Sequence, residues 1–495
     1  MLKSSLLEII RTFSIEEFLK FEDFIKSPYH NKNSNTIKLY SEIKKHSPEF
    51  SDEGLDKEIV WKKLFPEKEY NYGTMKNLIH ELTKLAMKFI VLEEFEENML
   101  EKDIILMNCL NERNIPKLFN VKMNELERQY SKDSFNKDYF FINDFYAAFS
   151  KINWIKIYHN RANNLNAVTE KDLIDSSATF IYSFLIYLFK YYNNVLTDSI
   201  NQNFSQEKNI LPVFLKEIAP EIIEKLLSVV KEHSIRDHKI LSVFWKMSRS
   251  QLNNQNIEYF FDFKKNLNDN LKILSRWDAK DLYSLLANIL NNIDPSKINI
   301  DKELLDISNS MLNNNIFFNR DGSMTSHDFL LYLSRAFNAG DYESIDNFTT
   351  KFLRKIPEES REYSRNISDA FLLFGEGKFG EVLEIITSLH HPNFMLKVRM
   401  KLLKAKCLYE LNDQITFDSE YKSTYHFLKN NKLLSPKVKS ETKYLFDRIK
   451  SMFRLKEKFS SFEFDKLKNE ISLGTLNKNS WLNVKMNEFK LRIKN

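Results

Sequence analysis

The feature that most constrains this chain is a helix–turn–helix unit of about 34 residues that recurs three times toward the C-terminal end. In each copy, apolar residues recur at helical spacing, and a turn-forming residue separates the two helices. The copies start at Ser326, Tyr363 and Val398, and their turn formers are Gly340, Gly377 and Asn412. Glycine and asparagine tolerate a positive φ angle, so each turn former is predicted to end the first helix of its unit.

This spacing resembles the tetratricopeptide repeat, in which each helix pair buries its apolar face against the next pair. Aromatic residues follow the turn in the first two copies, at Tyr342 and Phe379, whereas the third copy has Gln414 there. A small alanine in the first helix of each copy allows the two helices to approach closely. The repeats are therefore degenerate, and we describe them as tetratricopeptide-like.

Composition favours helices throughout the chain. The 495 residues include only 8 glycines and 10 prolines, and segments with helical periodicity are long. We therefore predict an all-α fold, a right-handed α-solenoid of helical hairpins with a helical N-terminal domain. The predicted divisions are an N-terminal helical domain at 1–100, degenerate hairpins at 101–320, tetratricopeptide-like repeats at 321–435 and basic capping helices at 436–495.

Individual helices are predicted from caps and apolar spacing. Ser14 and Glu17 form a capping box at the start of one helix, and the stretch Ser27–Asn33 ends it. A long helix is expected over Thr74–Glu97. Further predicted helices cover 139–163, 171–196, 211–233, 237–251, 257–274, 281–292 and 437–458, followed by a capping segment at 462–494.

Cysteine use and hydropathy indicate a reduced, cytoplasmic protein. Cys109 and Cys407 lie far apart in apolar helical contexts, which favours small buried side chains over a disulfide. The N-terminal residues contain no apolar run typical of a signal peptide. The longest apolar stretch, Ser176–Phe189, is shorter than the ~20 residues of a membrane span, so a buried helix is expected there.

Taken over its full length, the chain resembles an uncharacterised bacterial family of all-helical, tetratricopeptide-like proteins of roughly 500 residues. The similarity runs through Phe24–Asn31, Lys63–Pro66, Met75–Ile79 and the three repeats to Ser480–Leu482. His30 stands where an aromatic residue is expected. The resemblance implies a helical-repeat fold and brings no catalytic activity with it.

No catalytic, cofactor-binding or metal-binding residue is predicted. Gly375–Gly380 matches the glycine spacing of a dinucleotide loop, but the expected element before it is a helix and not the strand that such a loop follows. His390 and His391 lack further ligands nearby, and His80-Glu81 lacks the second histidine of a zinc-protease motif. The chain is therefore predicted not to be an enzyme.

Nucleic-acid binding is the alternative function. The segment from Ile59 to Leu85 loosely resembles the last helices of bacterial winged-helix regulators, and Lys76, Lys84 and Lys88 would face phosphate. However, the first hundred residues carry more acidic than basic side chains, which opposes the phosphate neutralisation that DNA binding needs. A simple helical cap is favoured. The basic helix over 437–458 is likewise expected to be a solvated surface, because its charges encircle the helix.

The predicted function is that of a protein-interaction scaffold or adaptor. By analogy with the tetratricopeptide fold, the first helices of the three units would line a concave groove for a protein or peptide. A mixed apolar and basic groove suits an extended peptide with some acidic character. No membrane partner is expected, and nucleic acid is not favoured. The predicted groove residues are His327, Ser334, Phe337, Asn338, Ser364, Phe371, Phe374, Arg399, Lys406, Tyr409 and Glu410.

Overall fold

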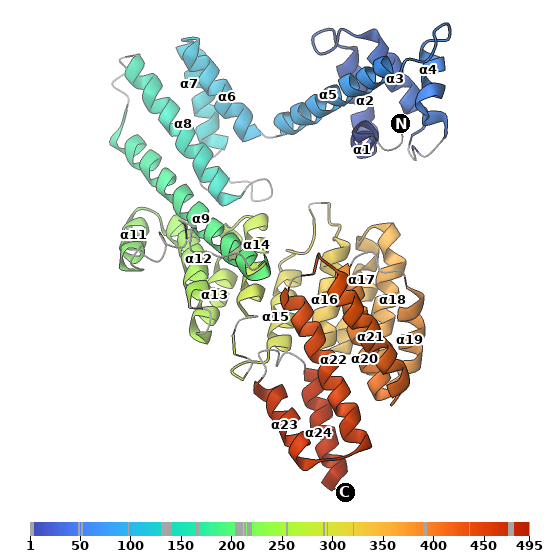
Figure 1. Cartoon of the computed structure of the whole chain (residues 1–495). Coiled ribbons are helices and arrows are strands. Elements are labelled where there is room, and N and C mark those ends of the chain that lie inside the picture. Colours follow the sequence, from blue (N-terminus) through green and yellow to red (C-terminus); the bar gives the residue numbers. More distant parts are fainter. Residues whose placement is uncertain are drawn as a thin grey trace. The chain divides into compact units, whose positions relative to one another are not determined.

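Helices form all of the regular structure in the part of the chain that the computed structural model describes (Figure 1). The described residues are 4–47, 50, 53–97, 99–129, 141–163, 168–202, 211, 214, 220–253, 256–290, 293–294, 296–319, 321–389, 394–434, 436–473 and 480–494. Within them, an isolated antiparallel bridge between Phe318 and Met324 is the only β-type pairing. The all-α prediction is therefore confirmed for these residues.

The chain divides into two compact units, which are described separately. The first comprises Met1–Asp133 and Lys151–Asp172, and the second comprises Ser134–Ser150 and Leu173–Asn495. The four divisions expected from the sequence stay predictions.

The first unit is built around the long helix α5. Phe21 of α2 lies at the centre of its core, with ring centroids 5.0 Å from Tyr40 and 5.2 Å from Phe89. Ser14 and Glu17 make the predicted capping box at the start of α2. The helices are α1 (Ser5–Ile10), α2 (Ile15–Lys26), α3 (Ser34–Lys44), α4 (Lys57–Leu64), α5 (Tyr72–Glu97), α6 (Met99–Glu112) and α7 (Pro116–Gln129), with a short 3-10 helix at Glu53–Leu55.

The second unit begins with longer helices that precede the predicted repeats. Helix α14 starts at Arg276, five residues before the predicted start, because the Ser275 hydroxyl accepts the backbone N–H of Asp278 and so caps the helix. The helices are α8 (Ile142–Ala162), whose residues from Lys151 on belong to the first unit, α9 (Glu170–Gln202), α11 (Pro220–His233), α12 (Ile235–Leu252), α13 (Ile257–Asn270), α14 (Arg276–Leu290) and α15 (Ile300–Asn313).

Helix α9 contains the apolar stretch Ser176–Phe189 and is only partly buried. Tyr182, Ile186 and Phe189 are buried, whereas Phe180 is 61% and Tyr191 60% exposed. Within the described residues, Glu170–Val195 is the one segment long and apolar enough to cross a membrane by length and composition alone. The expectation of a buried helix therefore holds for one face of α9.

Three helical hairpins follow, at the positions of the predicted repeats. Gly340, Gly377 and Asn412 have φ angles of 75°, 77° and 59°, so all three turn formers adopt the predicted left-handed conformation. Each helix contacts the next along the chain, and α16 also contacts α18. The hairpins are α16 (Ser326–Ala339) with α17 (Tyr342–Phe352), α18 (Glu358–Gly375) with α19 (Phe379–Ser388), and α20 (Phe394–Glu410) with α21 (Gln414–Asn430).

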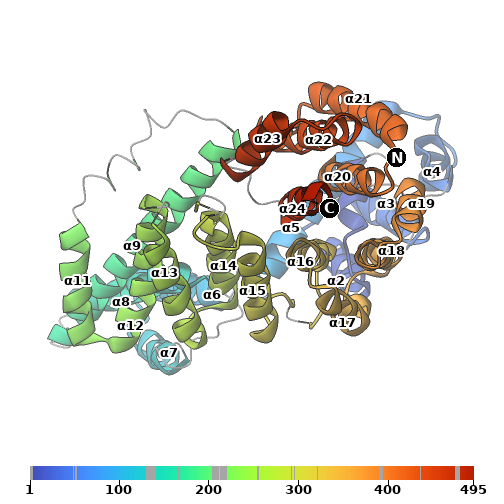
Figure 2. The same cartoon turned by 90° about the horizontal axis from the view of Figure 1, so that it is seen from below.

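The described chain closes with α22 (Pro436–Glu457), α23 (Ser461–Leu473) and α24 (Ser480–Lys494). Helix α24 contacts α16 and α23. Leu482 and Met486 of α24 are buried in one cluster with apolar residues of α20 and α22. Figure 2 shows α24 beside α16 and α20, on the inner side of the first helices of the hairpins. The segment predicted as a C-terminal cap thus forms two helices, and the second packs on the repeats.

Candidate functional site

The first helices of the three hairpins carry the predicted groove residues. Thr325 caps α16 by accepting the backbone N–H of Asp328, and the left-handed turn at Gly340 ends that helix. Helices α18 and α20 follow the same hairpin pattern. We call this set of predicted groove residues the hairpin face. It consists of His327, Ser334, Phe337 and Asn338 of α16, Ser364, Phe371 and Phe374 of α18, and Arg399, Lys406, Tyr409 and Glu410 of α20.

Aromatic contacts join α16 to α18 on the hairpin face. Phe337 stacks on Phe371 with ring centroids 4.2 Å apart and meets the edge of Phe374 at 5.2 Å. Both phenylalanines of α18 are buried, while Phe337 is half-buried. His327 and Asn338 are exposed. The apolar centre of the predicted groove is therefore packed, and its exposed residues lie on α16.

Helix α24 covers one end of the hairpin face. The indole Nε1 of Trp481 donates a 2.9 Å hydrogen bond to Oε1 of Glu410, and Nζ of Lys485 lies 2.9 Å from the same oxygen. The Trp481 ring also meets the edge of Tyr409, with centroids 5.5 Å apart. These contacts combine an aromatic anchor with a charged hydrogen bond, which is the chemistry common at protein–protein contacts.

Lys406 lies buried beneath this end of α24. Its Nζ atom is 5.4 Å from the centroid of Phe337 and 5.8 Å from that of Trp481. Burial lowers the pKa of Lys406 to about 8, and the negative charge of Asp301 on α15 opposes that shift. Two aromatic faces thus provide part of the electrostatic compensation that water gives to an exposed ammonium group.

The other end of the hairpin face carries two arginines. Nη1 of Arg399 donates to Oγ of Ser334 at 3.3 Å, and Nη1 of Arg335, the next residue of α16, donates to Oγ of Ser308 on α15 at 2.7 Å. Burial lowers the pKa of Arg335 to about 10, and the charge of Arg399 adds to that effect. Burial also lowers the pKa of Arg399. The sequence analysis missed Arg335 because its repeat position is not among those assigned to the groove.

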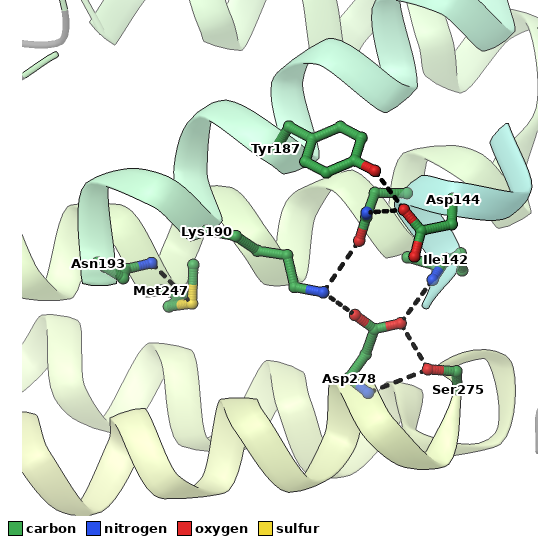
Figure 3. A network of polar contacts seen from close by, with 9 residues as sticks. Ile142, Asp144, Tyr187, Lys190, Asn193, Met247, Ser275 and Asp278 are labelled. Carbon is green, nitrogen blue, oxygen red and sulfur yellow. Dashed lines mark hydrogen bonds and ion pairs between the residues drawn. The ribbon is translucent and has the colours of Figure 1, made fainter. Parts of the chain in front are cut away.

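A buried polar network forms a second candidate site in the same unit (Figure 3). Nζ of Lys190 on α9 lies 2.7 Å from Oδ1 of Asp278 on α14, 2.9 Å from Oδ1 of Asn143 and 3.8 Å from the centroid of the Phe141 ring. The other oxygen of Asp278 accepts the backbone N–H of Ile142 at 2.8 Å and the Ser275 hydroxyl at 2.6 Å.

Every bond in this network joins groups of the protein itself. Asp278 is fully buried, and both of its oxygens accept hydrogen bonds from α8, α9 or the start of α14. Tyr187 donates to the neighbouring Asp144, and that carboxylate together with burial raises the pKa of the tyrosine. Because Lys190 and Asp278 form an ion pair and each makes further hydrogen bonds, we infer that the network stabilises the fold. The capping pattern of Ser275 and Asp278 was the sequence signal that could have revealed it.

The motifs considered for catalysis or metal binding lie in ordinary helices and turns where the structure describes them. Gly375–Gly380 spans the end of α18, the turn at Gly377 and the start of α19, so a helix precedes it as expected. Among the described residues, no group of three or more His, Cys, Asp or Glu side chains is arranged to hold a metal ion. His390 and His391 lie outside the described residues.

Basic residues weighed for nucleic-acid binding have differing surroundings. Lys76, Lys84 and Lys88 are exposed on α5, and no strand occurs in the described part of the first hundred residues. On α22, Arg448 pairs with Glu470, and Lys450 lies 4.2 Å from the Tyr421 ring centroid. Several α22 cations thus make contacts within the chain.

Comparison with known proteins provides no relative. No protein-family model, no curated protein and no solved structure matches the chain.

Proposed function

We propose that this chain is a tetratricopeptide-like repeat protein, an α-solenoid of helical hairpins, that binds another protein through the hairpin face. The observation that carries the proposal is the position of α24, which lies against this face through Trp481, Lys485 and the buried Leu482. A surface that holds a helix of its own chain has the chemistry to hold a similar segment of a partner.

The repeat geometry supports this proposal. Three consecutive hairpins have left-handed turns, and the first helices α16 and α18 contact each other. Repeat proteins use the extended surfaces of such hairpins for recognition. The proposed role requires no catalytic group, so the chain acts as a scaffold or adaptor and not as an enzyme. The cytoplasm is the proposed location, and the two cysteines, Cys109 and Cys407, are both free thiols.

A variant pair tests the proposal. The tagged full chain would be purified from its native cells with nuclease present, and partners would be identified by quantitative cross-linking mass spectrometry. Lys406→Glu places a negative charge in the hairpin face, whereas Lys351→Glu makes the same change at an exposed position of α17. Circular dichroism would establish that both variants keep their helices.

We expect a stoichiometric protein that resists nuclease, cross-links to α16, α18 or α20, and is lost with Lys406→Glu but not with Lys351→Glu. Recovery of nucleic acid that is insensitive to Lys406→Glu would contradict the proposal and favour a DNA-binding regulator. A partner retained equally by both variants would also contradict it.

A further inference from the structure

Arg335 and Arg399 are two half-buried cations on neighbouring helices that have no carboxylate pair in the described part of the chain. In the part of the chain that is described, neither guanidinium has a carboxylate within ion-pair distance, and their hydrogen bonds go to serine hydroxyls. Four half-buried lysines of the same unit each lie within ion-pair distance of a carboxylate. These pairs are Lys190–Asp278, Lys264–Glu303, Lys280–Asp328 and Lys401–Glu420.

An unpaired guanidinium in a partly buried position is unfavourable, because a neutral hydroxyl replaces only part of its lost hydration. Two such groups on neighbouring helices also repel each other: burial lowers the pKa of Arg335, the charge of Arg399 lowers it further, and the charge of Asp328 opposes the shift. The nearest acidic residue on α16, Asp328, is already paired with Lys280 at 2.8 Å. An anion from outside the chain would remove both penalties.

Neighbouring polar groups fit an anion as well. Burial raises the pKa of Tyr363 on α18 to about 12, so its phenol stays protonated at neutral pH, and the charge of Arg399 acts on it. Hydroxyl donors beside guanidinium groups are typical of sites for carboxylates and phosphates.

The two ends of the hairpin face therefore differ in charge and in occupancy. The side-chain contacts of α24 lie at Lys406, Tyr409 and Glu410. Arg399 precedes Glu410 by about three helical turns, or roughly 16 Å along α20. One end thus accepts an aromatic and a basic side chain, while the other presents two guanidinium groups that lack a counter-ion.

We propose that Arg335 and Arg399 form a binding site for the carboxylates of an acidic segment of the protein partner. The inference rests on the proposed function, since it assigns the partner's chemistry at that same face. Each guanidinium offers parallel N–H donors to a carboxylate. The uncovered end of the hairpin face recognises acidic side chains, and the end occupied by α24 recognises an aromatic residue next to a cation.

The test uses the full chain and a blocked hexaglutamate peptide carrying a fluorophore, with hexaglutamine as the neutral control. Binding is measured by fluorescence anisotropy for the wild type, Arg335→Gln, Arg399→Gln and the exposed control Arg354→Gln. We expect hexaglutamate alone to bind. Each site variant should lose at least tenfold in affinity, and the control should stay within twofold.

The charge-reversed variant Arg399→Glu tests specificity, since it should lose hexaglutamate and gain affinity for hexalysine. Equal binding of hexaglutamine, or equal losses in Arg354→Gln and the two site variants, would overturn the proposal. Displacement by inorganic phosphate at the same concentration as by peptide would also overturn it, because the ligand would then be a small anion.

The two proposals can fail separately. If no acidic peptide binds while a partner still depends on Lys406, the site is wrong and the protein-binding function stands. If hexaglutamate binds through both arginines but no partner depends on the hairpin face, the site stands and the function is wrong.

Discussion

Half-buried cations of the second unit differ in whether a carboxylate of the chain pairs with them. Lys190 is held by Asp278, Asn143 and the Phe141 ring, so its charge is matched within the chain. Arg335 and Arg399 have serine hydroxyls in place of carboxylates. Loss of hydration is unfavourable for any buried charge that has no partner. The difference separates a charge that stabilises the fold from charges that are available to a ligand.

Removing the carboxylate from the satisfied network should have the largest effect. Asp278→Ala leaves the Lys190 ammonium and two protein donors without their acceptor, so we expect a loss of about 3–5 kcal/mol in the free energy of unfolding. Chemical denaturation monitored by circular dichroism measures it. The double variant Lys190→Met, Asp278→Leu should recover most of the loss. A loss below about 1 kcal/mol for Asp278→Ala would mean that the ion pair with Lys190 contributes little to stability, and the contrast with the unpaired arginines would disappear.

Lys406 lies between the two extremes, since aromatic rings and Asp301 compensate its charge only in part. Its pKa of about 8 in the folded state is below the ordinary value of 10.5. The unfolded chain therefore binds more protons between these values, and the contribution of Lys406 to stability improves by up to about 1.4 kcal/mol per pH unit as pH rises from 8 toward 10.5. Below pH 8 the penalty is fully present.

The measurement is the difference in unfolding free energy between Lys406→Met and the wild type across this pH range. The advantage of the variant should shrink as pH rises. Lys351→Met, at an exposed position of α17, is the comparison variant. A difference for Lys406→Met that does not change with pH would show that the charge of Lys406 is well compensated.

Trp481→Ala tests how firmly α24 holds the hairpin face. The variant loses an aromatic contact with Tyr409 and the hydrogen bond to Glu410, so we expect local opening of α24 to become easier by about 2 kcal/mol. Hydrogen exchange should rise in α24 and on α16 but not around Asp278. Phe462→Ala, an exposed residue of α23, is the matched control. Unchanged exchange in α24 would place its anchor elsewhere.

Replacing Arg335 is expected to destabilise the fold least, and this variant tests directly whether the unpaired arginines stabilise the protein. Arg335→Met removes a half-buried charge that has no carboxylate partner, together with one hydrogen bond to Ser308, so the free energy of unfolding should not fall by more than about 1 kcal/mol and could rise. Thermal denaturation measures it. A loss comparable to that of Asp278→Ala would mean that Arg335 stabilises the fold and would remove the contrast on which the anion site depends.

Much of the local structure could be predicted from sequence because local rules fix it. Gly340, Gly377 and Asn412 satisfy the need for positive φ at a helix end, and Ser14 with Glu17 caps a helix within one turn of chain. These signals lie within a few residues of the structure that they specify.

The candidate site was less accessible from sequence because it depends on distant segments. Arg399 and Lys406 followed from repeat positions, but nothing near Trp481 indicated that it would pack on Glu410, 71 residues earlier in the chain. Whether a cation pairs with a carboxylate also depends on tertiary packing, because the two residues are usually far apart in the sequence. The unpaired state of Arg335 therefore became visible only with α15 and α20 in place.

The position of α24 has a consequence for biosynthesis. The ribosome delivers α16, α18 and α20 before α24, because Ser480 follows Glu410 in the chain. At ordinary elongation rates this interval lasts on the order of ten seconds. During that interval the residues around Tyr409 and Glu410 lack the helix that packs on them, so they are exposed until α24 emerges.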